Sequence, residues 1–232
     1  MSEILKINNL WGGYQDGVDI LRGISLEVQQ GEAVGIIGLN GSGKSTFGKA
    51  IMNMIPFRKG EIFFEGEDIT SLTTSQLSHR GISIMQQGGK VFPNLSVWDN
   101  LQLASQGNTV QLTDIIPLLQ RPKKELQHLM ADKLSGGQKH QLSLAMTLAS
   151  NPRLVILDEP SAGLSPKAVE EMYEILNTVR EKFEVTTILI EQNIAKAVTF
   201  CNKSMLLQQG LIACHVNRNN LQNIESIMFK TL

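Results

Sequence analysis

Apolar and polar positions alternate with a period of two near the start of this chain and lengthen to helical spacings further on. Residues 4–10 and 23–28 alternate as half-buried antiparallel strands do. Residues 33–37 form a short apolar run that ends at Gly38, which predicts a buried strand feeding a loop. Two further strands are expected at residues 61–64 and 82–85.

Helical spacing dominates the stretch from residue 95 to residue 130, where strand patterns are missing. The apolar residues that recur at these spacings are Val97, Leu101, Ala104, Ile115, Leu118 and Leu119, with interruptions at Gly107 and Pro117. A further helix carries its apolar face up to Ala149 and ends before Asn151 and Pro152. We therefore expect one domain over residues 1–232, with a small helical subdomain at about residues 88–150.

Strand and helix patterns alternate in the last third of the chain. Residues 154–157 are continuously apolar, as in a central parallel strand, and residues 186–190 form the next strand. Between them, Ser165 and Pro166 are a capping side chain and a proline suited to the first helical position. The buried stripe of that helix is expected to be Val169, Met172, Leu176 and Val179. A short tail helix is expected to bury Leu221, Ile224, Ile227 and Met228. The alternation predicts an α/β layer with parallel strands.

Composition excludes several classes of protein. The formal net charge of −1 argues against a main partner with a nucleic-acid backbone, which calls for a strong basic excess. No apolar stretch reaches the roughly 20 residues needed to cross a bilayer. The two cysteines, Cys201 and Cys214, suit a reducing cytosol. If the protein works at a membrane, we expect another polypeptide to hold it there.

Residues 38–46 satisfy the pattern GxxxxGK[ST] between a predicted strand and a predicted helix. That context distinguishes a phosphate-binding loop (P-loop) from a chance match. The loop amides and the helix N-terminus would surround phosphate oxygens, Lys44 would reach the β- and γ-phosphates, and the Ser45 hydroxyl would ligate Mg²⁺. The nucleotide-binding residues expected here are Gly38, Asn40, Gly41, Ser42, Gly43, Lys44, Ser45 and Thr46. A flexible loop that binds nothing would rarely place Lys-Ser-Thr at the head of an apolar helix.

Two carboxylates, Asp158 and Glu159, follow the apolar strand at residues 154–157. Ligands of open α/β sheets sit at this end of the strands. Asp158 is the expected Mg²⁺-side residue, and Glu159 the general base or orienting group for the attacking water. The pattern therefore predicts a nucleoside triphosphatase.

Residues 134–138 read Leu-Ser-Gly-Gly-Gln and open a predicted helix between the P-loop and the acidic strand. Ser135, Gly136, Gly137 and Gln138 would form a second anion site at that helix N-terminus. With its motifs in this order, the chain resembles the ATP-binding subunits of ABC transporters over essentially its whole length. The resemblance implies a P-loop NTPase fold: a RecA-like parallel core, an antiparallel β subdomain and a helical subdomain. It also implies ATP and Mg²⁺ as ligands, and ATP hydrolysis coupled to transport.

The same resemblance implies an assembly and several roles. Two subunits would face head to tail, so that residues 134–138 of one close on ATP held by the P-loop of the other. A separate membrane permease would dock on the segment that starts at Gln87, where Val91, Phe92 and Trp98 are candidate contacts. Tyr14 matches the aromatic residue that stacks on adenine, with Trp11 as the second choice. Gln87 matches the glutamine that senses Mg²⁺ and water.

Three departures from the family pattern bear on mechanism. Gln86 stands where relatives often have proline, and Ser161 stands where many have aspartate. Gln192 replaces the usual switch histidine. A glutamine can donate a hydrogen bond toward a γ-phosphate but carries no charge, so we expect hydrolysis with Gln192 as a positioning group.

One subgroup shares the glutamine at position 192, the run at residues 88–96, the loop at residues 161–164 and the short helical insert. The chain resembles this subgroup, the second ATPase subunit of importers for branched-chain amino acids or urea and amides. That resemblance implies a permease, a solute-binding protein and a second ATPase subunit, identical or paralogous, at the cytoplasmic face of the membrane. Three other hypotheses stay open: an exporter ATPase of the lipid or lipopolysaccharide type, a non-transport ABC ATPase acting on DNA or ribosomes, and a P-loop kinase. The kinase has no need of residues 134–138.

Overall fold

The computed structural model describes residues 2–105, 109–119 and 121–220. The chain divides into two compact units, one drawn from Met1–Leu77 and Thr186–Leu232 (unit 1) and the other from Ser78–Val185 (unit 2). Among the described residues, no helix combines the length and apolar character that a membrane span requires. The expected tail helix and Gly107 lie outside the described residues.

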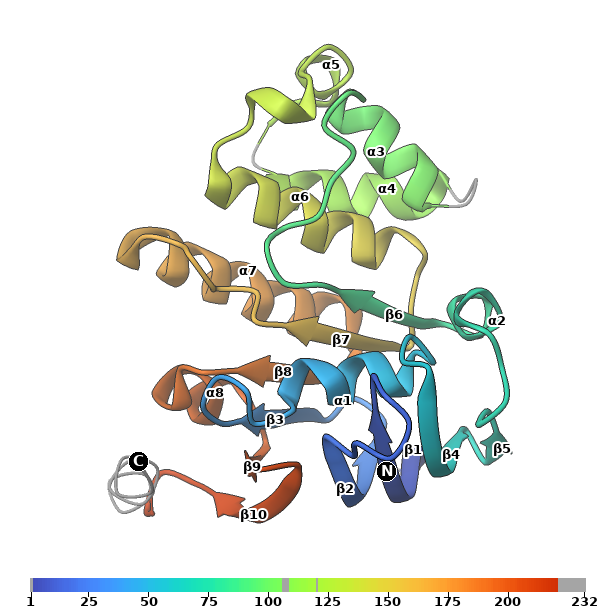
Figure 1. Cartoon of the computed structure of the whole chain (residues 1–232). Coiled ribbons are helices and arrows are strands. Elements are labelled where there is room, and N and C mark those ends of the chain that lie inside the picture. The colour runs from blue at the N-terminus through green and yellow to red at the C-terminus, as the bar shows by residue number, and fades with distance from the viewer. Residues whose placement is uncertain (1, 106–108, 120, 221–232) are drawn as a thin grey trace. The chain divides into compact units, whose positions relative to one another are not determined.

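Unit 1 contains an antiparallel sheet with the strand order β2-β1-β4-β5 (Figure 1). Its strands are β1 (Glu3–Gly13), β2 (Leu21–Gln29), β4 (Phe57–Phe64) and β5 (Glu67–Asp68). The alternating patterns therefore predicted β1 and β2 correctly. Strand β4 begins four residues before the predicted start at Glu61, because pairing with β1 continues to the partners Gly13 and Phe57.

The second set of strands in unit 1 has the order β10-β9-β3-β8. Strand β3 (Ala33–Ile37) pairs in parallel with both β8 (Thr186–Glu191) and β9 (Lys203–Gln208), and β10 (Leu211–Val216) runs antiparallel to β9. Every residue of β3 is buried, since helix α1 (Lys44–Ile51) packs on β8 and helix α8 (Ile194–Phe200) packs on β3. This confirms the predicted parallel layer.

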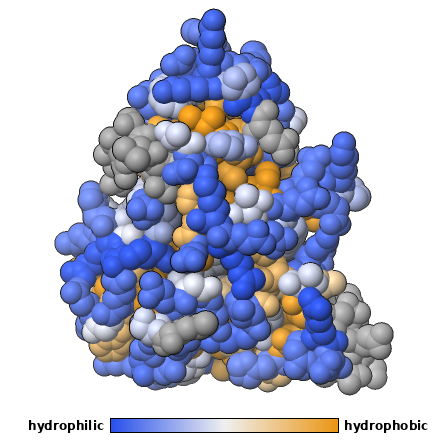
Figure 2. Space-filling view, turned by 180° about the vertical axis from the view of Figure 1, so that it is seen from behind, coloured by the Kyte–Doolittle hydropathy of each residue, from blue (hydrophilic) through white to orange (hydrophobic). Residues whose placement is uncertain are grey.

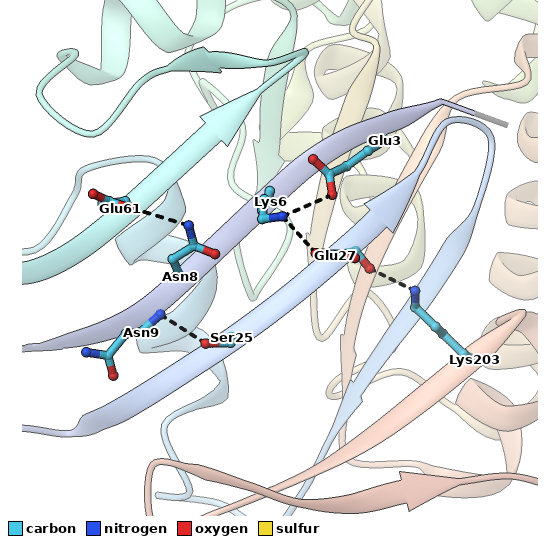
Figure 3. A network of polar contacts seen from close by, with 8 residues as sticks. All are labelled: Glu3, Lys6, Asn8, Asn9, Ser25, Glu27, Glu61 and Lys203. Atoms are coloured by element: carbon cyan, nitrogen blue, oxygen red, sulfur yellow. Dashed lines mark hydrogen bonds and ion pairs between the residues drawn. The ribbon is translucent and has the colours of Figure 1, made fainter.

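A polar network covers the surface of β1 and its neighbours (Figure 3). The Lys6 ammonium lies 3.0 Å from the carboxylate of Glu27, and this contact raises the pKa of Lys6 above its usual value. The Lys203 ammonium donates to the backbone carbonyl of Glu27 at 2.8 Å and pairs with Glu32 at 3.0 Å. Since Lys203 begins β9 and Glu27 lies in β2, this contact fastens the two sets of strands together.

Unit 2 combines a parallel strand pair with a group of helices (Figure 1). Strand β6 (Ile82–Met85) pairs with β7 (Leu154–Asp158), and helix α7 (Pro166–Phe183) follows β7. Helix α2 (Thr74–His79) lies at the first passage of the chain from unit 1 to unit 2. The remaining helical segments are α3 (Val97–Ala104), α4 (Thr109–Ile115), η1 (Ile116–Leu119), α5 (Lys123–Leu126), η2 (Ala131–Lys133) and α6 (Gly136–Ala149).

The predicted start of α7 is correct, because Ser165 caps the helix by accepting from the amide of Ala168. The predicted buried stripe needs a correction. Val169 is only partly buried, whereas Tyr173 and Ile175, which were not predicted, are buried. Val169 lies near the start of α7, where Pro166, Lys167 and Glu170 are exposed and the buried face begins only at Met172.

Candidate functional site

The P-loop at residues 38–46 joins β3 to α1 in unit 1. Gly43 precedes the helix with φ of 103°, a left-handed conformation that favours glycine. As a glycine, Gly43 supplies no side-chain cap to α1. Amides at the N-terminus of a helix are oriented as an anion site requires.

Two side chains of the loop are buried beside these amides. Lys44 is 4% exposed, and its ammonium donates to the carbonyl of Leu39 at 3.0 Å. The hydroxyl of Ser42 is buried and has no hydrogen-bond partner among the described residues. A buried polar atom without a partner fits a site that a ligand oxygen completes, so the loop suits a phosphate group.

The carboxyl end of β8 lies beside this loop. Ile37, the last residue of β3, is the register partner of Glu191, and Gln192 follows directly. The buried Glu191 carboxylate accepts from the amides of Gln192 and Asn193 at 3.0 and 3.3 Å. Asn193 then caps α8 by accepting from Lys196. These contacts fix the backbone of Gln192 at the same sheet edge as the P-loop.

Geometry separates the two aromatic candidates for adenine stacking. The Trp11 indole donates to the side chain of Asn9 at 2.9 Å, and its ring packs against Gly23. Tyr14 follows β1 in a loop and is 44% exposed. A base needs a free ring face, so the structure favours Tyr14 over Trp11.

Gln87, Asp158 and Glu159 are brought together in unit 2. Gln87 follows β6, Asp158 is the last residue of β7 and Glu159 comes directly after it, and the ends of these adjacent parallel strands are register partners at Met85 and Leu157. The Gln87 amide donates to the Glu159 carboxylate at 2.6 Å, and both carboxylates are buried. Glu159 has φ of 48°, a strained conformation for a residue with a side chain. Such strain is concentrated at functional sites.

The segment at residues 134–138 opens α6 with a complete capping box. The Ser135 hydroxyl accepts from the amide of Gln138 at 3.3 Å, and the Gln138 side chain accepts from the amide of Ser135 at 3.0 Å. Ser135 and Gly136 are exposed. They line a pocket of about 670 Å³ whose opposite wall is the start of α7, including Ser165 and Ala168.

The site residues thus fall into two sets. Unit 1 holds the P-loop, Gln192 and Tyr14, and unit 2 holds Gln87, the acidic pair and residues 134–138. Within the described chain, no group of three or more His, Cys, Asp or Glu side chains could hold a metal ion. A protein cage for a metal is therefore lacking there, whereas Mg²⁺ in nucleotide sites takes one or two protein ligands together with phosphate.

Sequence reasoning missed three groups next to the P-loop. Glu191 anchors Gln192, the carbonyl of Leu207 lies against Gly38, and the amide of Gly210 donates to the carbonyl of Ser42 at 3.0 Å. The buried acid before Gln192 and the pair Gln209-Gly210 after an apolar run were the available signals. Ser161, one of the departures noted in the sequence, is buried in the loop that follows β7.

Comparison with known proteins finds relatives that all belong to one family. The family model described as ABC transporter matches residues 21–162. The high-affinity branched-chain amino acid transport ATP-binding protein BraG of Pseudomonas aeruginosa is 32% identical over 207 residues, which cover 87% of this chain and 88% of that protein. The lipopolysaccharide export system ATP-binding protein LptB of Escherichia coli (strain K12) is 30% identical, covering 91% and 89%.

Solved structures show the same fold. A nucleotide-free ATP-binding cassette from an ABC transporter matches with a TM-score of 0.84 at 24% identity, covering 97% of this chain and 96% of that one. A dimeric cassette in a post-hydrolysis state, bound to ADP and phosphate, matches with a TM-score of 0.80 at 22% identity, covering 92% and 98%. The predicted fold, a parallel core with an antiparallel β subdomain, is confirmed.

Proposed function

This chain belongs to the ATP-binding proteins of ABC transporters, which hydrolyse ATP to drive transport, and we propose that it does so in a head-to-tail pair, powering import of branched-chain amino acids or similar small polar solutes. In this proposal each ATP lies between the P-loop of one subunit and residues 134–138 of the other. Permease subunits carry the solute, and the chain works peripherally at the cytoplasmic face of the membrane.

One observation supports the proposal of a composite site above all. Ser135 and Gly136 are exposed at the N-terminus of a fully capped helix and line an open pocket of about 670 Å³ in unit 2. The capping box satisfies the amides of Ser135 and Gln138, which leaves those of Gly136 and Gly137 directed at the pocket. A phosphate of a nucleotide bound to a second subunit suits this pocket.

The P-loop binds the phosphates in this proposal. The amides at the start of α1 and the Lys44 ammonium surround the β- and γ-phosphates, the lysine turning from Leu39 toward them. The residues Ser45, Asp158 and Gln87 would hold Mg²⁺. When bound, this ion would neutralise charge that develops on the phosphate oxygens. Tyr14 stacks on the adenine.

Glu159 activates the attacking water. Its carboxylate takes a proton as the water oxygen bonds to the γ-phosphorus and the bond to the β-phosphate oxygen breaks, releasing ADP and phosphate. Gln87 holds the carboxylate in place through the 2.6 Å contact. Gln192, whose backbone Glu191 fixes, donates a hydrogen bond to the γ-phosphate without adding a charge.

The change Glu159→Gln tests the composite site. This variant keeps the shape of the side chain but removes the base, so we expect it to retain ATP and to dimerise. Light scattering after gel filtration, with and without ATP and Mg²⁺, measures the mass. Glu159→Gln combined with Lys44→Ala is the matched control and should stay monomeric. A single variant that binds ATP yet stays monomeric at saturating ATP would contradict the proposal.

Docking of a permease is proposed on unit 2. An apolar area is visible among hydrophilic atoms in the helical part of this unit (Figure 2). The large apolar side chains exposed in the described residues of unit 2 are Phe92, Leu103 and Met130. Trp98 is partly buried with the Lys123 ammonium 4.2 Å above its ring. Exposed apolar side chains of this kind suit contact with another protein.

The direction of transport and the cargo need a test in cells. BraG and an Archaeoglobus fulgidus LivF, each 32% identical to this chain, support amino-acid import, whereas LptB at 30% supports lipopolysaccharide export as the second candidate. In a strain lacking this chain, uptake of radiolabelled leucine should fall and return with the wild-type gene but not with Glu159→Gln. Normal uptake, with lipopolysaccharide retained in the inner membrane, would favour the exporter.

A further inference from the structure

The hairpin between β9 and β10 contacts the P-loop with its backbone. Its turn is Gln209-Gly210. The Gly210 amide donates to the carbonyl of Ser42 at 3.0 Å, and the Gly210 carbonyl accepts from the amide of Arg22 at 2.9 Å. One glycine therefore connects the phosphate loop to strand β2.

The contact leaves no room for a side chain. A Cβ on Gly210 would lie 2.0 Å from the carbonyl oxygen of Ile20, and Gly210 has φ of 81°. At the other end of the loop, a Cβ on Gly38 would lie 2.3 Å from the carbonyl oxygen of Leu207, which belongs to β9. The hairpin thus abuts the P-loop at two points, directly and through backbone atoms.

The hydrogen bond from Gly210 also fixes an amide that faces the phosphates. The peptide bond between Ser42 and Gly43 is trans and planar, so its carbonyl and its N–H point in opposite directions. Because the Ser42 carbonyl points to the hairpin, the Gly43 N–H points away from it, toward the open side of the loop. Rotating this peptide would turn one phosphate donor out of the site.

We propose that Gly210 is a positioning residue for ATP binding, acting through Ser42 to hold the Gly43 amide toward the phosphates. This inference rests on the proposed nucleotide site at residues 38–46. Gly210 touches no nucleotide in it. The β9–β10 hairpin, at residues 203–216, thus supports the P-loop at residues 38–46.

Gly66 offers a matched control. It ends the turn between β4 and β5, where Glu65 and Gly66 have φ of 52° and 79°, nearly the same as 48° and 81° at Gln209 and Gly210. A Cβ at Gly66 meets nothing within 4 Å. Gly66→Ala therefore carries the same left-handed backbone strain as Gly210→Ala without the contact to Ile20.

The test compares wild type, Gly66→Ala and Gly210→Ala by calorimetric titration with Mg²⁺-ATP and by thermal melting. We expect Gly66→Ala to bind within about twofold of wild type, and Gly210→Ala to bind at least roughly tenfold more weakly, the scale of one lost hydrogen bond with added strain. A folded Gly210→Ala that binds as Gly66→Ala does would overturn the proposal. Failure of wild type to bind would instead refute the proposed nucleotide site, and this inference with it.

If Gly210→Ala fails to fold, hydrogen exchange of the Gly210 amide in the wild-type protein tests the proposal instead. Binding of Mg²⁺-ATP orders the loop to which this amide donates, so its exchange should slow at least about fivefold more than that of amides in the β4–β5 turn. Equal change in the two turns would overturn the proposal.

Discussion

Two glycines, one from each proposed nucleotide-binding motif, differ in the atoms that surround them. A Cβ on Gly38 in the P-loop would meet the carbonyl of Leu207 at 2.3 Å and the Ser42 hydroxyl at 2.7 Å. A Cβ on Gly136 at the start of α6 would meet no described atom within 4 Å. The first glycine is required by the fold of its own chain. For the second glycine, the described residues place no such demand.

The difference indicates how the site is divided. The P-loop is braced by its own unit and buried around Ser42 and Lys44, and we propose that it is the part that first binds the phosphates. Residues 134–138 begin helix α6 with a complete capping box. They face an open pocket in unit 2. We interpret the first as the binding half and the second as the half that closes on the ATP of a partner.

The largest expected effect is the difference in free energy of unfolding between the alanine variants of these two glycines. Gly38→Ala should lower the free energy of unfolding by about 3 kcal/mol, because the methyl group displaces backbone. Gly136→Ala should leave it unchanged or raise it by up to about 1 kcal/mol, since alanine favours helix. Urea unfolding measures both. Equal losses in the two variants would contradict the comparison.

A smaller effect is expected at Gln192. Without its hydrogen bond to the γ-phosphate, Gln192→Ala should hydrolyse ATP roughly tenfold more slowly, with ATP affinity nearly unchanged. Turnover and titration calorimetry separate the two quantities. Gln192→Asn is the control, because it keeps the amide but shortens its reach. Unaltered turnover in Gln192→Ala would remove this residue from the mechanism.

The smallest effect is expected at the residue that stacks on the adenine. Tyr14→Ala should weaken ATP binding by about three- to tenfold, the scale of one lost stacking contact. Trp11→Ala should leave ATP affinity within about twofold of wild type while lowering the melting temperature, because its ring packs on Gly23. The opposite pattern would make Trp11 the stacking residue.

The sequence predicted those parts of the fold that local pattern determines. Strand β3 has the predicted bounds because its apolar run stops at Gly38, and Ser165 with Pro166 located the start of α7. Strands β9 and β10 and helix α8 were not predicted. Their apolar residues form short runs, and their places depend on distant partners: β9 pairs with β3, β10 pairs with β9, and α8 packs on β3.

The candidate site follows the same division. Motif spacing identified Lys44, Glu159 and residues 134–138, but it left Tyr14 and Trp11 as alternatives. In the structure the Trp11 indole donates to Asn9, whereas Tyr14 is 44% exposed, and Tyr14 stays the proposed stacking residue. The pair Gln209-Gly210 signals a turn, but its contact with Ser42 could not be predicted, because no local pattern links residues so far apart in the sequence.

Mixing two inactive variants tests the central claim of a composite site most directly. Lys44→Ala disables the P-loop, and Gly136→Asp places a negative charge against the phosphate while suiting the start of a helix. In a head-to-tail pair of the two, one site combines both defects and the other combines an intact P-loop with an intact Ser135–Gln138 segment. We expect each variant alone to be inactive and each mixed pair to regain up to about half of the wild-type ATP turnover, which is about a quarter per pair averaged over an equimolar, randomly paired mixture. A mixture as inactive as its components would contradict the account.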